Sequence, residues 1–197
     1  SSNFNTNSVT VNVTGNFSNT SMFTANASAI NVNGNWDNTG GTFNAGTSTV
    51  VFNGAGATAI SGSAAFNNFT CTTASKSITV AQGSTQTVGG LFRVDGSAFG
   101  TRVSLASSGG AGTTWNLVLN GRHDCRYVAV QGSNASGTAF LPINPAGYKN
   151  NGNNTNWYDP AFPLEMLFYD NFETSTLHST PPNKLSSSWT MGPGWHT

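Results

Sequence analysis

The feature that most constrains the fold is an internal repeat of about 20 residues near the start of the chain. Residues 11–28 read VNVTGNFSNTSMFTANAS, residues 30–48 read INVNGNWDNTGGTFNAGTS, and a third copy begins at Val50. The matched positions are Val11 with Ile30, Val13 with Val32 and Phe52, Gly15 with Gly34 and Gly54, Asn16 with Asn35, Phe17 with Trp36, Asn33 with Asn53, and Phe23 with Phe43. Such a repeat is typical of structural units that stack, because one unit alone is too small to bury its apolar side.

Each copy opens with apolar residues at every second position. These residues are Val9, Val11 and Val13, then Ile30 and Val32, then Val50 and Phe52. Alternation with a period of two predicts a β-strand with one buried and one solvated face. The same alternation returns more loosely in later segments that end near Val130, and none of them has a helical period. The chain therefore predicts many short strands and little helix.

Glycine and asparagine recur where the strands end. Gly15, Gly34 and Gly54 each follow an opening run, and we expect a positive φ angle at these corners, which glycine adopts readily. Asparagine side chains at equivalent corners can form hydrogen-bonded ladders. The candidate ladder pairs are Asn16 with Asn35 and Asn33 with Asn53.

These patterns predict an all-β fold, a single-stranded parallel β-helix (solenoid) of about 20-residue coils, followed by an extended C-terminal tail. Equivalent side chains in neighbouring coils would lie about 4.8 Å apart. The alternative is an antiparallel β-sandwich, whose strands also alternate apolar and polar residues and whose turns come roughly every 8–12 residues. A sandwich, however, does not require matching residues at a fixed period.

The sequence changes character at Pro142, where proline, asparagine and glycine become frequent. We therefore predict a repeat domain over 1–141 and a terminal turn and linker over 142–163. Residues 164–197 are more apolar and do not continue the repeat. They are predicted to form an aromatic β tail or the start of a second β domain.

Composition indicates a secreted protein that lies outside the cell or at its surface. Only 7% of the residues are charged and the net charge is zero, so nucleic acid and anionic membranes are not expected as partners. The aromatic and β-branched residues argue against disorder. No stretch of about 20 apolar residues predicts a membrane span. Cys71 and Cys125 form either one disulfide or two buried thiols, and their spacing does not decide between these.

The first 157 residues resemble long secreted bacterial surface proteins with β-helical repeats, the haemagglutinin and autotransporter-like group. The segments that carry the resemblance are the NGNW corner with its following GTF (33–43), TVVFNG (49–54), AISGSAAFNNFT (59–70), CRYVAVQGSNASG (125–137) and GNNTNW (152–157). The tail is similar to the opening of concanavalin-like jelly-roll modules, through the aromatic and acidic residues at 168–173 and the later Trp189, Thr190 and Trp195. That second resemblance implies no sugar- or calcium-binding residue here.

Residue types for catalysis are scarce in the repeat region. Asp37, Asp95 and Asp124 lie in different segments, whereas glycoside hydrolysis needs two carboxylates that face one sugar. His123 and Cys125 indicate either a Cys/His nucleophile pair or partial metal site, or a charged turn that enters the next strand. On a strand these two residues share one side while Asp124 faces away, which favours the turn. We therefore predict no enzyme activity, no cofactor and no metal site.

The predicted function is a structural subunit of an extracellular bacterial filament or surface stalk that assembles head to tail with copies of itself. The alternating pattern is entered by Val9 without a helix or a charged cap, and an open solenoid end can grow into a fibre. The residues predicted to assemble are Val9, Val11 and Val13 at the solenoid end, and Phe162, Leu164, Met166, Phe168, Tyr169 and Phe172 in the tail, which would add a strand to a neighbour. The alternative is an adhesin or carbohydrate-binding segment of a multidomain surface protein, in which Trp36 and Trp157 stack on glycans unless they are core aromatics.

Overall fold

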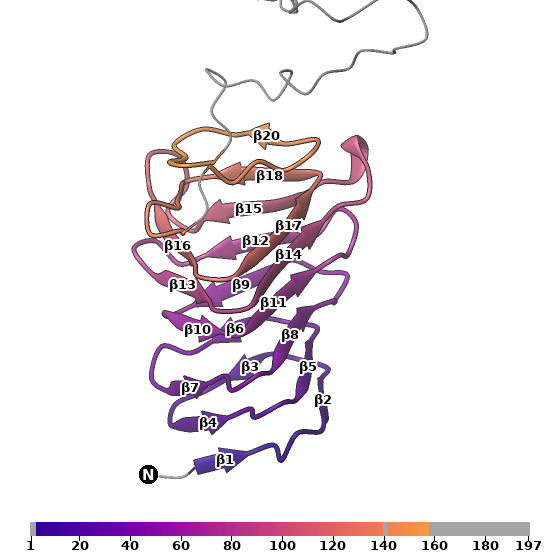
Figure 1. Cartoon of the computed structure of the whole chain (residues 1–197), viewed down its shortest axis with the longest axis vertical. Helices are drawn as coiled ribbons and strands as arrows, with labels where there is room; N and C mark the ends of the chain where they lie inside the picture. The colour runs from indigo at the N-terminus through magenta and orange to yellow at the C-terminus, as the bar shows by residue number, and fades with distance from the viewer. Residues whose placement is uncertain (1–2, 140–141, 158–197) are drawn as a thin grey trace, which may run out of the picture. The chain divides into compact units, whose positions relative to one another are not determined.

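The computed structural model describes residues 3–139 and 142–157. They belong to one compact unit that spans Ser1–Tyr158. Within the described residues the secondary structure is β apart from one short 3-10 helix, η1 (Phe99–Thr101), and every strand pair is parallel (Figure 1). The predicted all-β character with parallel strands is confirmed. The antiparallel sandwich is wrong, because none of the described pairings is antiparallel.

The strands form four sheets. The six-stranded sheet contains β2 (Thr10–Val13), β5 (Ala29–Val32), β8 (Thr49–Phe52), β11 (Asn68–Cys71), β14 (Leu91–Asp95) and β17 (Arg122–Arg126). The seven-stranded sheet contains β3 (Phe17–Ser18), β6 (Trp36–Asp37), β9 (Thr58–Ser61), β12 (Ser77–Val80), β15 (Val103–Ser107), β18 (Val128–Gln131) and β20 (Lys149–Asn150). The smaller sheets contain β1 (Asn3–Asn5), β4 (Met22–Thr24) and β7 (Thr42–Asn44), and then β10 (Ala64–Phe66), β13 (Thr85–Val88), β16 (Trp115–Leu119) and β19 (Ser133–Asn134).

The chain visits these sheets in turn. In the six-stranded sheet each strand pairs with the strand three positions later, so the chain returns to the same sheet once per repeat (Figure 1). Val11 pairs with Ile30 and Ile30 with Val50, which confirms the alignment made from the sequence. The repeat then lengthens, because Phe69 pairs with Phe92 and Phe92 with His123. The extra residues form longer loops, including the one that contains η1.

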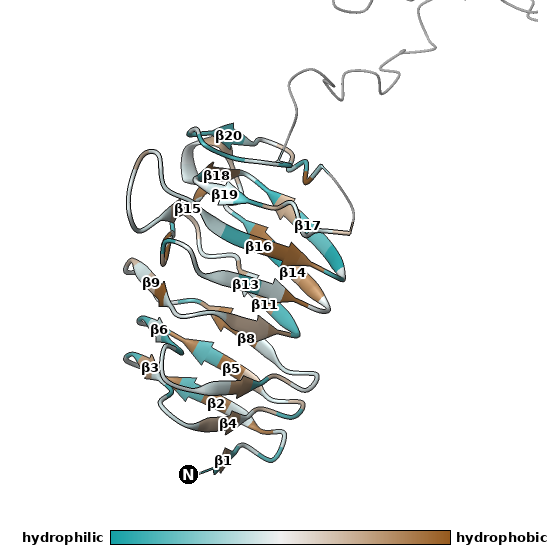
Figure 2. Cartoon of the chain, turned by 90° about the vertical axis from the view of Figure 1, so that its left-hand side faces the viewer, coloured by the Kyte–Doolittle hydropathy of each residue, from teal (hydrophilic) through white to brown (hydrophobic). Residues whose placement is uncertain are grey.

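The interior is one continuous apolar cluster that follows the strands. Buried inward positions of β5, β8 and β11 alternate with half-buried outward positions, most of which are polar, and Figure 2 shows hydrophobic and hydrophilic residues side by side on the same strands. Aromatic rings stack between successive strands, as Phe17 does on Trp36 with ring centroids 4.0 Å apart. Phe23 and Phe43 are partners on β4 and β7, with ring centroids 5.9 Å apart and ring planes tilted by 36°. The buried rings of one repeat therefore pack on those of the next.

The corner glycines are needed for a different reason from the one predicted. Gly15, Gly34 and Gly54 do not have a positive φ angle, so that prediction is wrong. A Cβ atom on Gly34 would instead lie 2.5 Å from Oδ1 of Asn16, and one on Gly54 would overlap the carbonyl oxygen of Asn33. At these two corners glycine allows the backbone of one repeat to approach the repeat before it closely.

Asparagine ladders are present, but at positions other than the predicted ones. Nδ2 of Asn31 donates to Oδ1 of Asn12 over 2.8 Å, and Nδ2 of Asn19 donates to Oδ1 of Asn38 over 2.8 Å. The predicted pair Asn16 and Asn35 makes a different contact, in which the backbone N–H of Asn35 donates to Oδ1 of Asn16. The bond between Asn19 and Asn38 satisfies two buried side chains that water does not reach, whereas the other two bonds lie at the surface.

The packed unit extends beyond the boundary predicted at residue 141. Residues 142–157, which we call the closing segment, lie within the stretch 142–163 that was predicted as a terminal turn and linker. They add β20 to β18 and form isolated parallel bridges, of which one joins Arg126 to Ala146 and another joins Asn134 to Thr155. Ile143 and Trp157 of this segment are buried. Low hydrophobicity and frequent proline suggested a linker, but a few well-placed apolar residues are enough to attach the segment.

The two cysteines are free and buried. Cys71 pairs with Val94 on the next strand, and Val94 pairs with Cys125 on the one after. Two interstrand steps place their Cα atoms about 9.6 Å apart. A disulfide requires a Cα–Cα distance below roughly 7 Å. Of the two alternatives that the sequence left open, the structure therefore supports two separate thiols.

Candidate functional site

One side of the packed unit is formed by strands that have a partner on one side only. These are β1, β2 and β3, each the last strand of its sheet, and we call them the open edge (Figure 1). An edge of this kind presents unpaired backbone N–H and C=O groups, which can pair with a further strand. The open edge is therefore the first candidate for an interaction site.

Apolar side chains are exposed at the open edge. Phe4 of β1 is 59% exposed, whereas Phe23, its partner on β4, is buried. Val9, which directly precedes β2, is 53% exposed, and Met22 on the following strand β4 is 42% exposed. Val11 and Val13 of β2 are half-buried, whereas Ile30 and Val32, their partners on β5, are fully buried. The predicted assembly residues Val9, Val11 and Val13 thus lie together at an incomplete end of the core.

The opposite side of the unit is formed by the closing segment and is built differently. Ile143 and Trp157 are buried there, and the ring of Tyr148 stacks on Trp157 with centroids 6.1 Å apart. Pro142 and Pro145 have no backbone N–H, so at these positions the segment cannot donate to a further strand. Proline on an outer strand is a common way to prevent edge-to-edge pairing.

The remaining predicted site residues lie in two other places. Phe162, Leu164, Met166, Phe168, Tyr169 and Phe172 lie outside the described residues. Trp36 and Trp157, the candidate sugar-stacking residues, are both buried in the apolar cluster. A ring that stacks on a sugar must present a face to solvent, so the structure favours the core interpretation of these two tryptophans.

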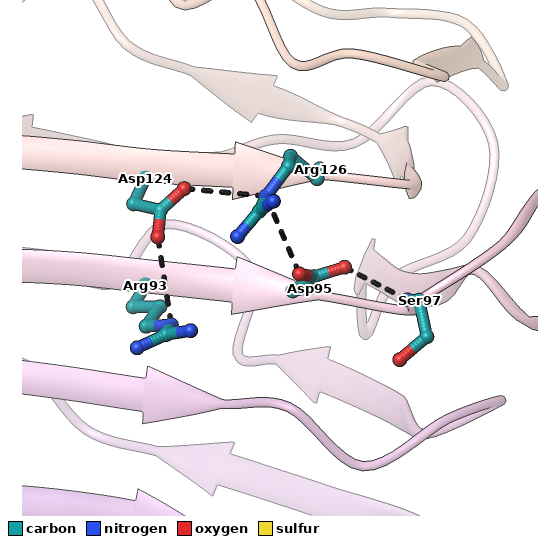
Figure 3. A network of polar contacts seen from close by, with 5 residues as sticks. All are labelled: Arg93, Asp95, Ser97, Asp124 and Arg126. Carbon is teal, nitrogen blue, oxygen red and sulfur yellow. Dashed lines mark hydrogen bonds and ion pairs between the residues drawn. The ribbon is translucent and has the colours of Figure 1, made fainter.

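A chain of ion pairs crosses β14 and β17 on the outward face of the six-stranded sheet (Figure 3). Nε of Arg93 lies 3.5 Å from a carboxylate oxygen of Asp124, and Nε of Arg126 lies 3.5 Å from Asp124 and 3.4 Å from Asp95. Asp95 also accepts a hydrogen bond from the backbone N–H of Ser97. The carboxylates are paired with arginines and lie on an open surface, which suits a cross-strand brace better than a catalytic pair.

His123 and Cys125 lie on the inward side of β17, where they pair with the buried Phe92 and Val94 of β14, as the alternation predicts. Burial raises the pKa of the Cys125 thiol, and the carboxylate of Asp124 raises it further. Burial lowers the pKa of His123. A protonated, enclosed thiol is a poor nucleophile and a poor metal ligand. The segment is strand β17, so the predicted charged turn is wrong, and the burial of the thiol does not favour a nucleophile pair or a metal site.

Lys76 is a buried cation that the sequence did not reveal. Its side chain is only 1% exposed, and Nζ donates to the carbonyl oxygens of Gly54 at 2.7 Å and Gly56 at 2.5 Å. Burial lowers its pKa, with a smaller opposite effect from Cys71. The ammonium satisfies two carbonyls of the loop before β9, so it stabilises a corner between repeats.

Phe99 is an exposed aromatic residue that was also missed. It lies in η1 and is 64% exposed. The guanidinium of Arg102 lies 4.9 Å from its ring centroid, and the Tyr127 ring packs edge-on at 5.3 Å. Arg102 also donates to the carbonyl oxygen of Gly147 over 2.8 Å. No period in the sequence marks this loop, because its side chains pair across distant segments.

In residues 3–139 and 142–157 no group of three His, Cys, Asp or Glu side chains is placed to hold a metal ion. No helix in the part of the chain that the structure describes is long and apolar enough to cross a membrane. No family model, no curated protein and no solved structure matches the chain.

Proposed function

We propose that the described residues form a parallel β-helix and that the protein is a secreted structural subunit of an extracellular filament or surface stalk. The β-helix is supported by the parallel pairing of each strand with an equivalent strand one repeat later. The filament is supported by the exposed apolar residues of the open edge. Soluble single domains rarely leave such an edge unprotected, because it pairs readily with other chains.

The unequal ends favour a heterologous contact between subunits. A contact between two different surfaces repeats from one subunit to the next and produces a fibre, whereas a contact between identical surfaces closes into a dimer. The prolines of the closing segment make direct stacking of that segment on the open edge unfavourable. Strand addition from the tail of a neighbouring copy avoids this obstacle, because the tail itself supplies the N–H and C=O groups.

Sedimentation velocity combined with negative-stain microscopy tests the proposal. The native protein is expected to form a concentration-dependent series of species that end in filaments. Particles that stay monomeric at high concentration would contradict it. Deletion of residues 162–197 is expected to abolish assembly and leave a folded monomer, since the packed unit ends before this segment.

A charged substitution at the open edge provides a matched test. Val9→Lys places an ammonium at an exposed edge position, which disfavours strand addition without disturbing the core. Phe99→Lys makes the same kind of change at an exposed apolar residue of η1, which is not part of the open edge. Assembly should be lost in the first variant and retained in the second. Equal effects would mean that assembly depends on general surface hydrophobicity.

A glycan-binding segment is the second proposed function, and Phe99 is the observation that favours it. Its exposed ring is held by Arg102 and Tyr127, and fixed surface aromatics can stack on sugars. A glycan array probed with the native protein and with Phe99→Ala tests this function. Binding that is equal in both proteins, or absent from both, would count against it.

A further inference from the structure

The outward side of the open edge ends in an incomplete amide ladder. Asn31 donates to Oδ1 of Asn12, and both residues occupy outward positions on paired strands. The side chain of Asn12 is exposed, and within the described residues its own Nδ2 has no acceptor. The ladder can continue only if the next strand places a hydrogen-bond acceptor beside Asn12.

The inward side of the same strand sets a second requirement. Val11 and Val13 flank Asn12 and remain half-buried, while the equivalent residues of β5 are fully buried. A strand that completes the core must place an apolar residue beside each valine. The occupant of β2 is therefore a segment with the order apolar, acceptor, apolar.

Two triplets after residue 157 have this order without a proline, namely Leu164-Glu165-Met166 and Trp189-Thr190-Met191. We propose that Leu164, Glu165 and Met166 of a second copy pair in parallel with Val11, Asn12 and Val13, and that the Glu165 carboxylate accepts the hydrogen bond from Nδ2 of Asn12. This inference rests on the filament function proposed above. Of the two acceptors the carboxylate is the stronger, because it is charged.

Electrostatics permit a carboxylate at this position. Residues 3–36 contain no Asp, Glu, Lys or Arg, so Glu165 meets no like charge at the open edge. The outward position also leaves the carboxylate in contact with water, so it is not buried without compensation. A carboxylate has no donor to offer to a further side chain, and it therefore ends the ladder after one added strand.

Chain length requires that this segment comes from another copy. Seven interstrand steps separate β2 from Trp157, through the six-stranded sheet, the Ala146 bridge and the bridge from Ile143 to Trp157. At 4.8 Å a step this is about 34 Å. The seven residues from Trp157 to Leu164 span about 25 Å at most when fully extended. Leu164 cannot reach the open edge of its own chain, whereas Thr190 is not limited in this way.

Cysteine cross-linking between two separately purified variants tests the pairing. Asn12→Cys and Glu165→Cys proteins are mixed and oxidised, and a covalent heterodimer is expected, because paired Cα atoms in adjacent strands lie within disulfide range. Cys71 and Cys125 are buried and do not compete. The matched control is a mixture of Asn12→Cys with Thr190→Cys, which should give much less product.

The other outcomes separate this inference from the proposed function. Cross-linking to position 190 instead of 165, or an Asn12→Cys homodimer, overturns the assigned segment and leaves assembly standing. Absence of any cross-link, while the native protein still forms filaments, also overturns the segment alone. If the native protein is monomeric and no cross-link forms, both the inference and the filament fail.

Discussion

The two ends of the six-stranded sheet differ in chemistry although the backbone pairing between them is continuous. The inward column begins with Val11 at β2 and ends with His123 at β17. The neighbouring outward column begins with Asn12 and ends with Asp124. The β2 end is thus uncharged, with valine inside and asparagine outside. The β17 end carries titratable and ion-paired residues and is followed by the closing segment.

This difference shows what burial depends on in a stacked fold. Val11 and Ile30 occupy equivalent positions in equivalent strands, yet only Ile30 is fully buried, because it has a strand on both sides. At the far end the closing segment supplies that second side with few apolar residues, among them Ile143 and Trp157. The burial of a side chain in an end strand therefore depends on whether another segment packs on that strand, and not on how apolar the strand itself is.

The largest effect is expected from aromatic truncation at the two ends. Trp157→Ala should lower the free energy of unfolding by about 3–5 kcal/mol, because it empties a buried site. Phe4→Ala should lower it by less than about 1 kcal/mol, since the ring is mostly exposed already. Urea denaturation at low protein concentration measures both values. A large loss for Phe4→Ala would mean that the open edge is covered in solution.

The asparagine ladders should show the same contrast on a smaller scale. Asn19 is buried and donates to Asn38 and to the carbonyl oxygen of Thr42, so Asn19→Ala leaves two acceptors without this donor. We expect a loss of about 1–3 kcal/mol. Asn12→Ala, on the exposed edge, should cost less than about 0.5 kcal/mol in the monomer. Equal losses in denaturation experiments would contradict the assigned burial.

Acidification should affect the far end and not the open edge. Burial lowers the pKa of His123 below its ordinary 6.5, with a smaller opposite effect from Asp124. The folded state therefore favours the neutral ring, and this contribution to stability is complete above pH 6.5. It is lost as the pH falls from 6.5 through the folded pKa. The loss should be small, because the ring is partly exposed.

Comparison with a variant isolates this titration. His123→Leu should remove the part of the pH dependence that appears between pH 7 and pH 5, as measured by urea denaturation at each pH. His178 and His196 remain in both proteins, so their contribution cancels. An unchanged pH profile in the variant would show that His123 does not titrate differently in the folded state.

The repeat could be predicted from the sequence because stacking repeats the same requirement at each copy. Val11, Ile30 and Val50 occupy the same inward position in successive strands. Aligning them in the sequence predicts the strand register that the structure shows. The ladder pairs could have been found in the same alignment, since Asn12 matches Asn31 and Asn19 matches Asn38. The predicted corner pair differs because Oδ1 of Asn16 accepts from the backbone N–H of Asn35 and not from its side chain.

Features that depend on contacts between unlike segments could not be predicted in this way. Nζ of Lys76 donates to the backbone carbonyls of Gly54 and Gly56. This contact could not be predicted, because the pattern of side-chain types does not show which backbone carbonyls are free to accept. The closing segment resembles a linker in composition, yet Trp157 anchors it. The sequence predicts glycine at the corners from its tolerance of positive φ angles. At Gly34 the actual reason is the close approach of Asn16, which leaves no room for a Cβ atom.

The smallest expected effect concerns the ion pairs of the far end. Asp124→Asn removes the carboxylate that contacts Arg93 and Arg126, at 3.5 Å in both cases. All three side chains are 40–49% exposed, so the loss should be within about 1 kcal/mol and should shrink as salt is added. Asp37→Asn is the matched control, because among the described residues the Asp37 carboxylate bonds only to the nearby Thr39. If assembly used the charged end instead of the open edge, Asp124→Asn would alter the sedimentation of the native protein far more than its stability.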